Sequence, residues 1–121
     1  MEPKLTLVLG ASPNKERYSN LAVRRLRAHG HPTLAVGRRE GLIGDQPILL
    51  AIPEGVRPHT VTMYLNASNQ QAWTDVLLRL SPERIIFNPG SENPPLAKAS
   101  EAQGIEIVEG CTLVMLSTGQ Y

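Results

Sequence analysis

Short segments rich in glycine, serine, asparagine or arginine follow several apolar runs of this sequence. The first segment, GASPNKERYS, contains Gly10, Ala11, Ser12, Arg17 and Ser19. A glycine lets a bulky anion approach the backbone, serine hydroxyls can donate hydrogen bonds, and a guanidinium matches phosphate geometry. The segment therefore predicts a phosphate site. The alternative interpretation is that Gly10 only makes a turn, Ser19 only caps a helix and Arg17 is only solvated.

The segment Gly37-Arg38-Arg39, which follows the second apolar run, helps to define which phosphate ligand fits. A dinucleotide fingerprint, G-x-G-x-x-G, needs glycines where Ser12 and Lys15 stand, and an acid that binds the ribose hydroxyls. Gly37, Arg38 and Arg39 stand at the position of that acid. Basic residues there attract a phosphorylated ribose, which argues against NAD and leaves NADP and coenzyme A (CoA). The alternative is that both arginines are solvated loop charges.

Alternating apolar runs and helical periodicities indicate which elements position these segments. We expect strands at residues 5–9, 32–36, 60–65, 84–87 and 105–108, with a shorter strand or edge segment at 48–52. We expect helices at residues 20–29, 69–80 and 95–103. Ser19 or Asn20 is the predicted cap of the first helix, and Gly30 is predicted to end it. Residues 37–47 are predicted to be a long loop, and periodicity leaves the tail CTLVML either helical or extended.

This order predicts an α/β fold: a Rossmann-like, doubly wound, mostly parallel sheet of about five strands with helices on both faces. Such sheets bind ligands outside the carboxyl ends of their strands, where the strand order reverses. The segments described above follow predicted strands, so the phosphate site is expected in a crevice at that edge.

Five segments carry a resemblance to a known family: GASPNKERYS, GRREG, TVTMYLN, RIIFNPGSEN and CTLVMLSTGQY. They resemble the small stand-alone CoA-binding proteins, which are similar to the amino-terminal CoA-binding domain of the succinyl-CoA synthetase alpha subunit. The likeness covers nearly the whole chain. Its most specific parts are GASPN-x-x-RYS and FNPG-x-EN. The resemblance implies a Rossmann-like fold that holds CoA in the predicted crevice.

The resemblance also implies roles for individual residues. The pyrophosphate would be held by Gly10, Ala11, Ser12, Arg17 and Ser19. The adenosine and its 3′-phosphate would lie near Gly37 and Arg38. The pantetheine arm would be bordered by Leu65 and Asn66. The far end, where the thiol emerges, would be shaped by Asn88, Pro89, Gly90 and Glu92. The stretch GDQPILLAIPEGVRP lacks the longer proline-rich loop common in the family, so the wall formed there is expected to differ.

We expect no catalytic residues and no metal site in this chain. His29, His31 and His59 are predicted to lie at the edge of the sheet opposite the crevice, without cysteine or carboxylate at ligand spacing. Cys111 either lies near the CoA thiol, where a mixed disulfide could form, or is a small buried apolar residue. Glu92 is a lone carboxylate. The synthetase reaction needs a phosphorylated histidine on a second domain and a partner subunit, so it is not transferred.

Composition sets the wider limits. The 121 residues fit one domain, residues 1–121, and 41% of them are apolar and 19% charged. A net charge of +1 gives no general reason to expect nucleic acid as a partner. The first apolar run is too short for a signal peptide or a membrane span, so we expect no membrane association and a cytoplasmic location. Dimerisation through the CTLVML tail is left open.

Three functions remain in competition. The first is a module that binds CoA or an acyl-CoA without catalysis. The second is an NADP-binding domain of a small oxidoreductase. The third is an interaction subunit whose nucleotide pocket is vestigial.

Overall fold

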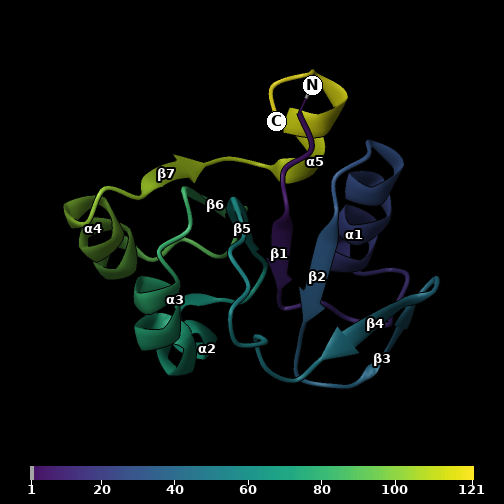
Figure 1. The fold of residues 1–121 in the computed structure, drawn as a ribbon, viewed down its shortest axis with the longest axis horizontal. Helices are drawn as coiled ribbons and strands as arrows, with labels where there is room; N and C mark the ends of the chain where they lie inside the picture. Colours follow the sequence, from purple (N-terminus) through teal and green to yellow (C-terminus); the bar gives the residue numbers. More distant parts are fainter. Residues whose placement is uncertain (1) are drawn as a thin grey trace.

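A seven-stranded sheet forms the centre of the protein, which is described here by a computed structural model of residues 2–121 (Figure 1). The strand order is β3-β4-β2-β1-β5-β6-β7. All neighbouring strands are parallel except β3 and β4, which are antiparallel. The strands are β1 (Thr6–Leu9), β2 (Thr33–Val36), β3 (Gly41–Ile43), β4 (Gln46–Leu49), β5 (Thr60–Met63), β6 (Arg84–Phe87) and β7 (Glu106–Glu109).

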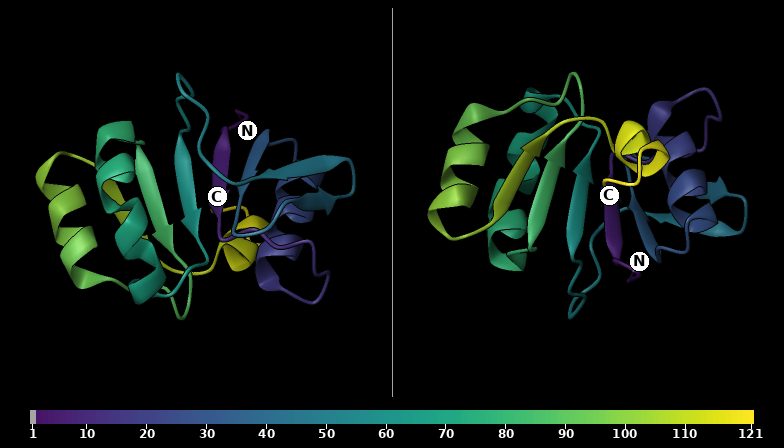
Figure 2. Two further views of the ribbon diagram at one scale, coloured as in Figure 1. Left: turned by 90° about the horizontal axis from the view of Figure 1, so that it is seen from below. Right: turned by 90° about the horizontal axis from the view of Figure 1, so that it is seen from above.

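Helices cover both faces of this sheet (Figure 2). They are α1 (Tyr18–Ala28), α2 (Ala67–Gln70), the 3-10 turn η1 (Gln71–Trp73), α3 (Thr74–Leu80), α4 (Pro94–Ala102) and α5 (Thr112–Ser117). Leu77 of α3 and Leu96 of α4 belong to the core on one face, whereas Leu26 of α1 and Leu116 of α5 belong to the core on the other. The α/β architecture predicted from the sequence is therefore confirmed.

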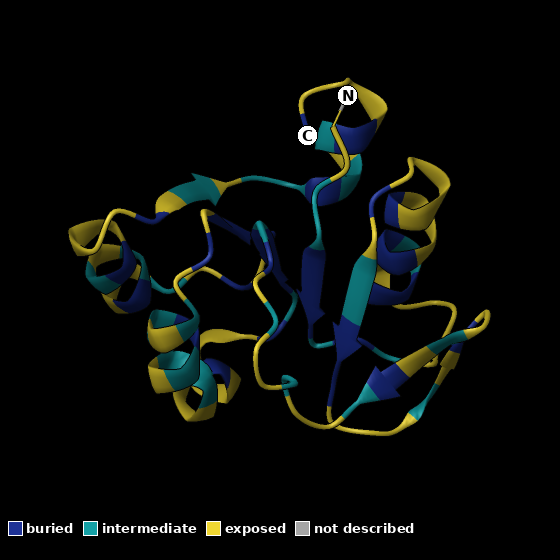
Figure 3. Ribbon diagram, viewed as in Figure 1, coloured by how far each residue is buried: buried dark blue, intermediate teal, exposed yellow. Residues whose placement is uncertain are grey.

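Apart from Arg84, the central strands β1, β5 and β6 consist of apolar residues and threonine, because both of their faces are covered. Every residue of β1, β5 and β6 is buried (Figure 3). Alternate residues of β1 point to opposite faces, so Leu7 and Leu9 join one core while Val8 joins the other. The strands thus form a rigid base for the loops at their ends.

The predicted count of about five strands is wrong, because residues 37–47 are not a loop. A hairpin forms there: β3 and β4 pair across a turn that contains Gly44, whose φ of 61° lies in the left-handed region. Its tip is tied to α1 by an ion pair of 2.6 Å between Arg27 and Asp45. The strand expected at residues 48–52 is accordingly Gln46–Leu49, with Pro47 opposite Leu42.

Two helix predictions also need correction. The helix expected at residues 69–80 begins at Ala67 and is interrupted by η1, where Trp73 packs half-buried against the core. The residue in the N-cap position of α1 is Arg17, so neither Ser19 nor Asn20 caps that helix; both are buried within its first turn. The tail that periodicity left undecided is the short helix α5.

Candidate functional site

The loops that follow β1, β2, β5 and β6 meet at one edge of the sheet, which we call the carboxyl edge. They comprise residues 10–17, 37–40, 64–66 and 88–93. β1 pairs with β2 on one side and with β5 on the other, and the strands of both pairs are parallel. The chain leaves β1 through α1 towards β2 and later returns to the opposite side of β1. The strand order therefore reverses between β1 and β5, where sheets of this kind bind ligands.

Gly37 is required at this edge because two loop backbones touch. A Cβ atom at Gly37 would lie 2.1 Å from the Ala11 carbonyl oxygen. The Gly37 amide donates to the Leu49 carbonyl at 2.9 Å, which fixes the loop in place. Gly37 is predicted to lie near the adenosine, which stays a prediction; its immediate neighbour in the structure is another loop of the protein.

Gly10 has a similar role between β1 and β5. Its φ is 97°, and a Cβ there would lie 3.1 Å from the backbone nitrogen of Leu65. The amides of Gly10 and Ala11 both donate to the Val36 carbonyl, at 2.8 and 3.0 Å. These two residues therefore shape the edge, and their amides are already engaged within the protein.

Free backbone donors lie slightly further along the same loop. Within residues 2–121, the amides of Ser12, Tyr18 and Ser19 donate to no protein acceptor. Tyr18 and Ser19 open α1, an 11-residue helix whose positive dipole end lies there. Ser19 itself is only 5% exposed.

Asn20 preforms this loop, a role that the sequence analysis missed. Its Nδ2 atom donates to the Ser12 carbonyl at 2.9 Å, and its Oδ1 atom accepts from Arg24 Nε at 2.9 Å. The Ser12 hydroxyl accepts from the Asn14 amide at 3.1 Å. The only signal in the sequence is a polar residue among the apolar positions of α1, and that position alone does not identify the partner.

Two arginines at the edge keep their charges free. Arg17 and Arg38 are exposed, and within the part of the chain that the structure describes neither forms an ion pair with a carboxylate. Arg17 stands at the start of α1, where its charge adds to the potential of the free amides. The edge thus combines donors and positive charge, a suitable environment for a phosphate group.

Asn88 is buried and its side chain is engaged by the scaffold. Its Nδ2 atom donates to Thr62 Oγ1 at 2.7 Å and to the Met63 carbonyl at 2.9 Å, and its Oδ1 atom accepts from the Thr112 amide at 2.9 Å. Asn88 consequently ties β5, the loop after β6 and the start of α5 together. Its predicted place at the far end of the ligand remains a prediction.

The rest of that loop is open. Pro89, Gly90 and Glu92 are exposed, and a Cβ at Gly90 would meet nothing within 4 Å. The Gly90 amide donates to Glu92 Oε1 at 2.9 Å, so the carboxylate stabilises its own turn.

The loop after β5 carries the residues predicted to border the pantetheine arm. Leu65 is 8% exposed, whereas Asn66 is exposed and caps α2 by accepting from the Asn69 amide at 2.9 Å. Gln70, a residue that the sequence analysis missed, is completely buried and donates to the carbonyls of Leu65 and Ser91. Its signal was available, because Gln70 stands three and seven positions before Trp73 and Leu77 on one helical face.

Tyr64 and Cys111 lie on the α5 side of the same edge. Burial raises the pKa of Tyr64 well above its ordinary value, and the charge of a nearby Cys111 thiolate would raise it further. The Tyr64 hydroxyl is buried and has no partner among the described residues. Cys111 is half-buried at the N-cap of α5, and its role near a thiol remains a prediction.

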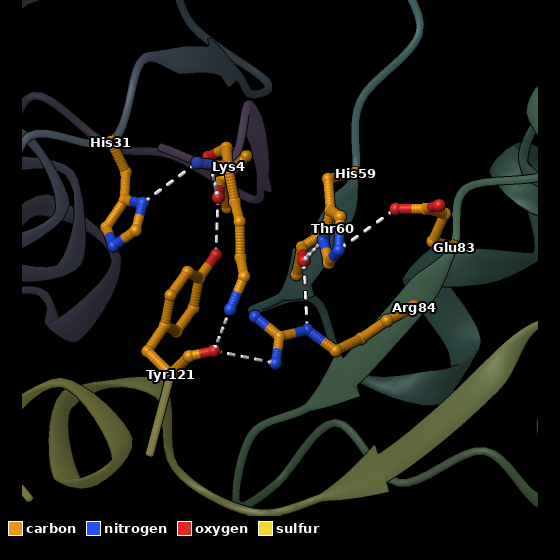
Figure 4. Close-up of polar contacts among 8 residues, drawn as sticks. Lys4, His31, His59, Thr60, Glu83, Arg84 and Tyr121 are labelled. Atoms are coloured by element: carbon orange, nitrogen blue, oxygen red, sulfur yellow. Dashed lines mark hydrogen bonds and ion pairs between the residues drawn. The ribbon is translucent and has the colours of Figure 1, made fainter. Parts of the chain in front are cut away.

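Two of the three histidines that were predicted to lie at the edge opposite the crevice are found at that other edge of the sheet. His31 and His59 belong to a cluster at the other edge of the sheet, together with Lys4, Thr60, Glu83, Arg84 and Tyr121 (Figure 4). We call this edge the amino edge. Across residues 2–121, no group of three His, Cys, Asp or Glu side chains could hold a metal ion. No described helix is long and apolar enough to cross a membrane.

Two cavities lie away from the carboxyl edge. One of about 380 Å³ borders the amino edge and is lined in part by Arg57, His59 and Glu83. The other, of about 110 Å³, lies between α1 and α5, beside Arg25 and Leu116. Neither of these two cavities is lined by the loops of the carboxyl edge.

The fold and this edge define a small α/β protein whose strand order reverses at an edge with exposed arginines and free backbone donors among the described residues. Within that class, the chain belongs to the CoA-binding domain family, whose model matches residues 4–117. An uncharacterized protein of known crystal structure shares 46% sequence identity with this chain. The match has a TM-score of 0.93 and covers 100% of both chains. A Thermus thermophilus protein is 24% identical, with a TM-score of 0.84 and coverage of 98% of this chain and 91% of its own.

A hypothetical protein from Pyrococcus horikoshii OT3 shares the fold at 20% identity, with a TM-score of 0.81. The match covers 95% of this chain and 82% of the Pyrococcus protein. No protein among those with curated descriptions matches the sequence.

Proposed function

We propose that this chain binds CoA or an acyl-CoA along the carboxyl edge of a Rossmann-like, doubly wound sheet and catalyses no reaction of its own. Membership of the CoA-binding domain family supports the ligand class. The observation that carries the proposal is the group of free amides at Ser12, Tyr18 and Ser19, beside the unpaired guanidinium of Arg17. These donors would bind the diphosphate.

The remaining predicted contacts follow from this position. Arg38 follows β2, beside the adenosine side of the edge, and its free charge would bind the 3′-phosphate. Leu65 and Asn66 would border the pantetheine arm, and the open loop Pro89–Glu92 would surround its thiol end. Cys111 and Glu92 would shape that end without acting on the ligand.

Calorimetric titration of the purified protein tests the proposal. We expect CoA to bind and Arg17→Ala to weaken it about tenfold, since a charge-assisted hydrogen bond contributes about 1.5–3 kcal/mol and this side chain is exposed. The fold should be unchanged by circular dichroism. Arg79→Ala, an exposed arginine on α3, is the matched control and should leave the CoA affinity unchanged.

Two competing functions give different results in the same experiment. Binding of NADP in place of CoA would favour a small oxidoreductase domain. Absence of binding for both, combined with no small molecule released from the denatured protein in mass spectrometry, would favour an interaction subunit and overturn the proposal.

A further inference from the structure

Gln70 has an unusual position for a polar side chain. It is the last residue of α2 and is completely buried, directly beneath the loops that follow β5 and β6. A buried side-chain amide is destabilising unless its donors and acceptor are all paired. The partners of Gln70 therefore show which parts of the protein it holds.

Those partners connect two separate loops. Gln70 Nε2 donates to the Leu65 carbonyl at 2.8 Å and to the Ser91 carbonyl at 2.7 Å, which uses both of its hydrogens. Gln70 Oε1 accepts from Asn93 Nδ2 at 2.9 Å. Leu65 and Ser91 lie 26 positions apart in the sequence, so a single side chain fixes the separation of the two loops.

The connection extends into the neighbouring helices. Asn93 Oδ1 caps α4 by accepting from the Leu96 amide at 3.2 Å, and Asn66 caps α2. Gln70 makes no hydrogen bond to the loops of residues 10–17 or 37–40. A change at Gln70 should consequently move one part of the carboxyl edge and leave the phosphate-binding part in place.

We propose that Gln70 is a positioning residue that sets the distance between the two walls of the pantetheine arm, an inference that rests on the proposed function. The side chain does not touch the ligand. It holds the Leu65–Asn66 wall and the Ser91 wall in register, so that CoA is bound more tightly than the same nucleotide without its pantetheine arm.

The test uses Gln70→Glu and two ligands. Glutamate has nearly the same size, but its carboxylate cannot donate to the carbonyls of Leu65 and Ser91. The ligands are CoA and adenosine 3′-phosphate 5′-diphosphate, which lacks the arm. We expect Gln70→Glu to weaken the binding of CoA about tenfold and the binding of the nucleotide less than about twofold. The ratio of the nucleotide Kd to the CoA Kd should therefore fall.

A purely structural role would weaken both ligands equally or neither, and either result would overturn the inference. If the wild-type protein binds neither ligand, the proposed function itself fails, which is a different outcome. Gln103→Glu is the matched control, because Gln103 also donates to a carbonyl, that of Leu78 at 2.8 Å, but at the opposite end of α4. It should leave the ratio unchanged.

A second variant applies if Gln70→Glu does not fold. Asn93→Asp keeps an oxygen that can cap α4 but removes the donor to Gln70 Oε1. We expect it to lower the same ratio of Kd values by about threefold, because the Gln70 side chain then lacks its hydrogen bond from Asn93. An unchanged ratio in folded Asn93→Asp would also contradict the inference.

Discussion

The two edges of the sheet are held together by different kinds of side chain. At the carboxyl edge, the neutral amides of Asn88 and Gln70 connect the loops, and glycines let backbones approach closely. At the amino edge, Arg84 and Lys4 both donate to the Tyr121 main-chain oxygen (Figure 4). Positive charges are thus paired within the protein at the amino edge, whereas those of Arg17 and Arg38 are exposed at the carboxyl edge.

The amino edge shows how completely such charges can be absorbed. Arg84 is 6% exposed, donates to Thr60 Oγ1 at 2.9 Å, and places its guanidinium carbon 4.4 Å from the centre of the Tyr121 ring. His59 Nε2 and Glu83 Oε2 lie 3.0 Å apart beside it, a contact that becomes an ion pair only when His59 is protonated, and burial lowers the pKa of His59. An edge with this internal pairing has little charge to offer a ligand.

The contrast explains why the carboxyl edge is the better place for an anion. The hydrogen bonds that connect its loops come mostly from neutral amide side chains, so Arg17 and Arg38 are not needed for that pairing and stay exposed to solvent. Neutral amides also hold the loops equally well across a wide pH range, because they do not titrate.

The largest effect is expected at Gly37, where the carboxyl edge depends on backbone contact. In Gly37→Ala the new Cβ would lie 2.1 Å from the Ala11 oxygen, so one of the loops must shift. We expect a loss of about 3 kcal/mol in the free energy of unfolding, measured by urea denaturation. Gly110→Ala is the control, because its Cβ would lie 3.5 Å from Val108 Cγ1, an ordinary contact. Equal stability of the two variants would contradict the tight loop packing.

The next effect concerns the amino edge. Arg84→Gln removes the hydrogen bonds to Thr60 and Tyr121 and the contact with the Tyr121 ring. We expect a loss of about 2 kcal/mol in stability, with the CoA affinity unchanged. Arg79→Gln, at an exposed position, should change stability by less than about 0.5 kcal/mol. A clear loss of CoA affinity in folded Arg84→Gln would show that the two edges are not independent.

The central strands were predictable because they are fully buried. Apolar runs such as Ile85–Phe87 are typical of strands covered on both faces, and β6 has the predicted bounds. The β3–β4 hairpin was missed although Gly44-Asp45 is a recognisable two-residue turn. Its strands are short, Pro47 lies within one of them, and its ion pair to Arg27 comes from a distant helix.

The candidate site was predictable in its residue types and less so in their physical roles. The sequence indicates that Gly10 and Gly37 need to be glycine, but only the structure shows that neighbouring loops require it. Asn20 was missed because its partner is the backbone carbonyl of another segment, and the helical spacing of Gln70 indicates burial without indicating its partners, the carbonyls of Leu65 and Ser91. No local pattern specifies such a contact, since the fold alone brings the two segments together.

A smaller effect is expected for ligand discrimination by Arg38. If its exposed charge binds the 3′-phosphate, Arg38→Ala should weaken CoA about tenfold, or about 1.4 kcal/mol, and leave dephospho-CoA unchanged. Titration of both ligands into both proteins isolates the interaction as a double-mutant cycle. Arg25→Ala, an exposed arginine of α1 outside the carboxyl edge, should affect the two ligands equally and slightly. The same result for Arg38→Ala would place the 3′-phosphate elsewhere.

The smallest effect is expected in the pH dependence of stability, which should involve His31 at the amino edge and not the carboxyl edge. Burial lowers the pKa of His31, and the charge of Lys4 lowers it further, with smaller contributions from His29, Arg84 and His59. Below the ordinary pKa of about 6.5, His31 binds a proton in the unfolded chain, whereas in the folded protein it binds one only at a lower pH. Stability should therefore fall as the pH drops from 6.5 towards the lowered pKa, by less than about 1.4 kcal/mol per pH unit.

Urea denaturation between pH 7.5 and about 5.5 measures this slope, which spans the ordinary histidine pKa. In His31→Asn the slope should decrease, because the side-chain oxygen can still accept from the Lys4 amide that bonds His31 Nδ1 at 3.0 Å but does not titrate. His29→Asn, at the exposed end of α1, should keep the slope. Because neutral amides hold the carboxyl edge, its loops should keep their hydrogen-exchange protection over the same range. Loss of that protection in step with global stability would mean that both edges share one pH-sensitive scaffold.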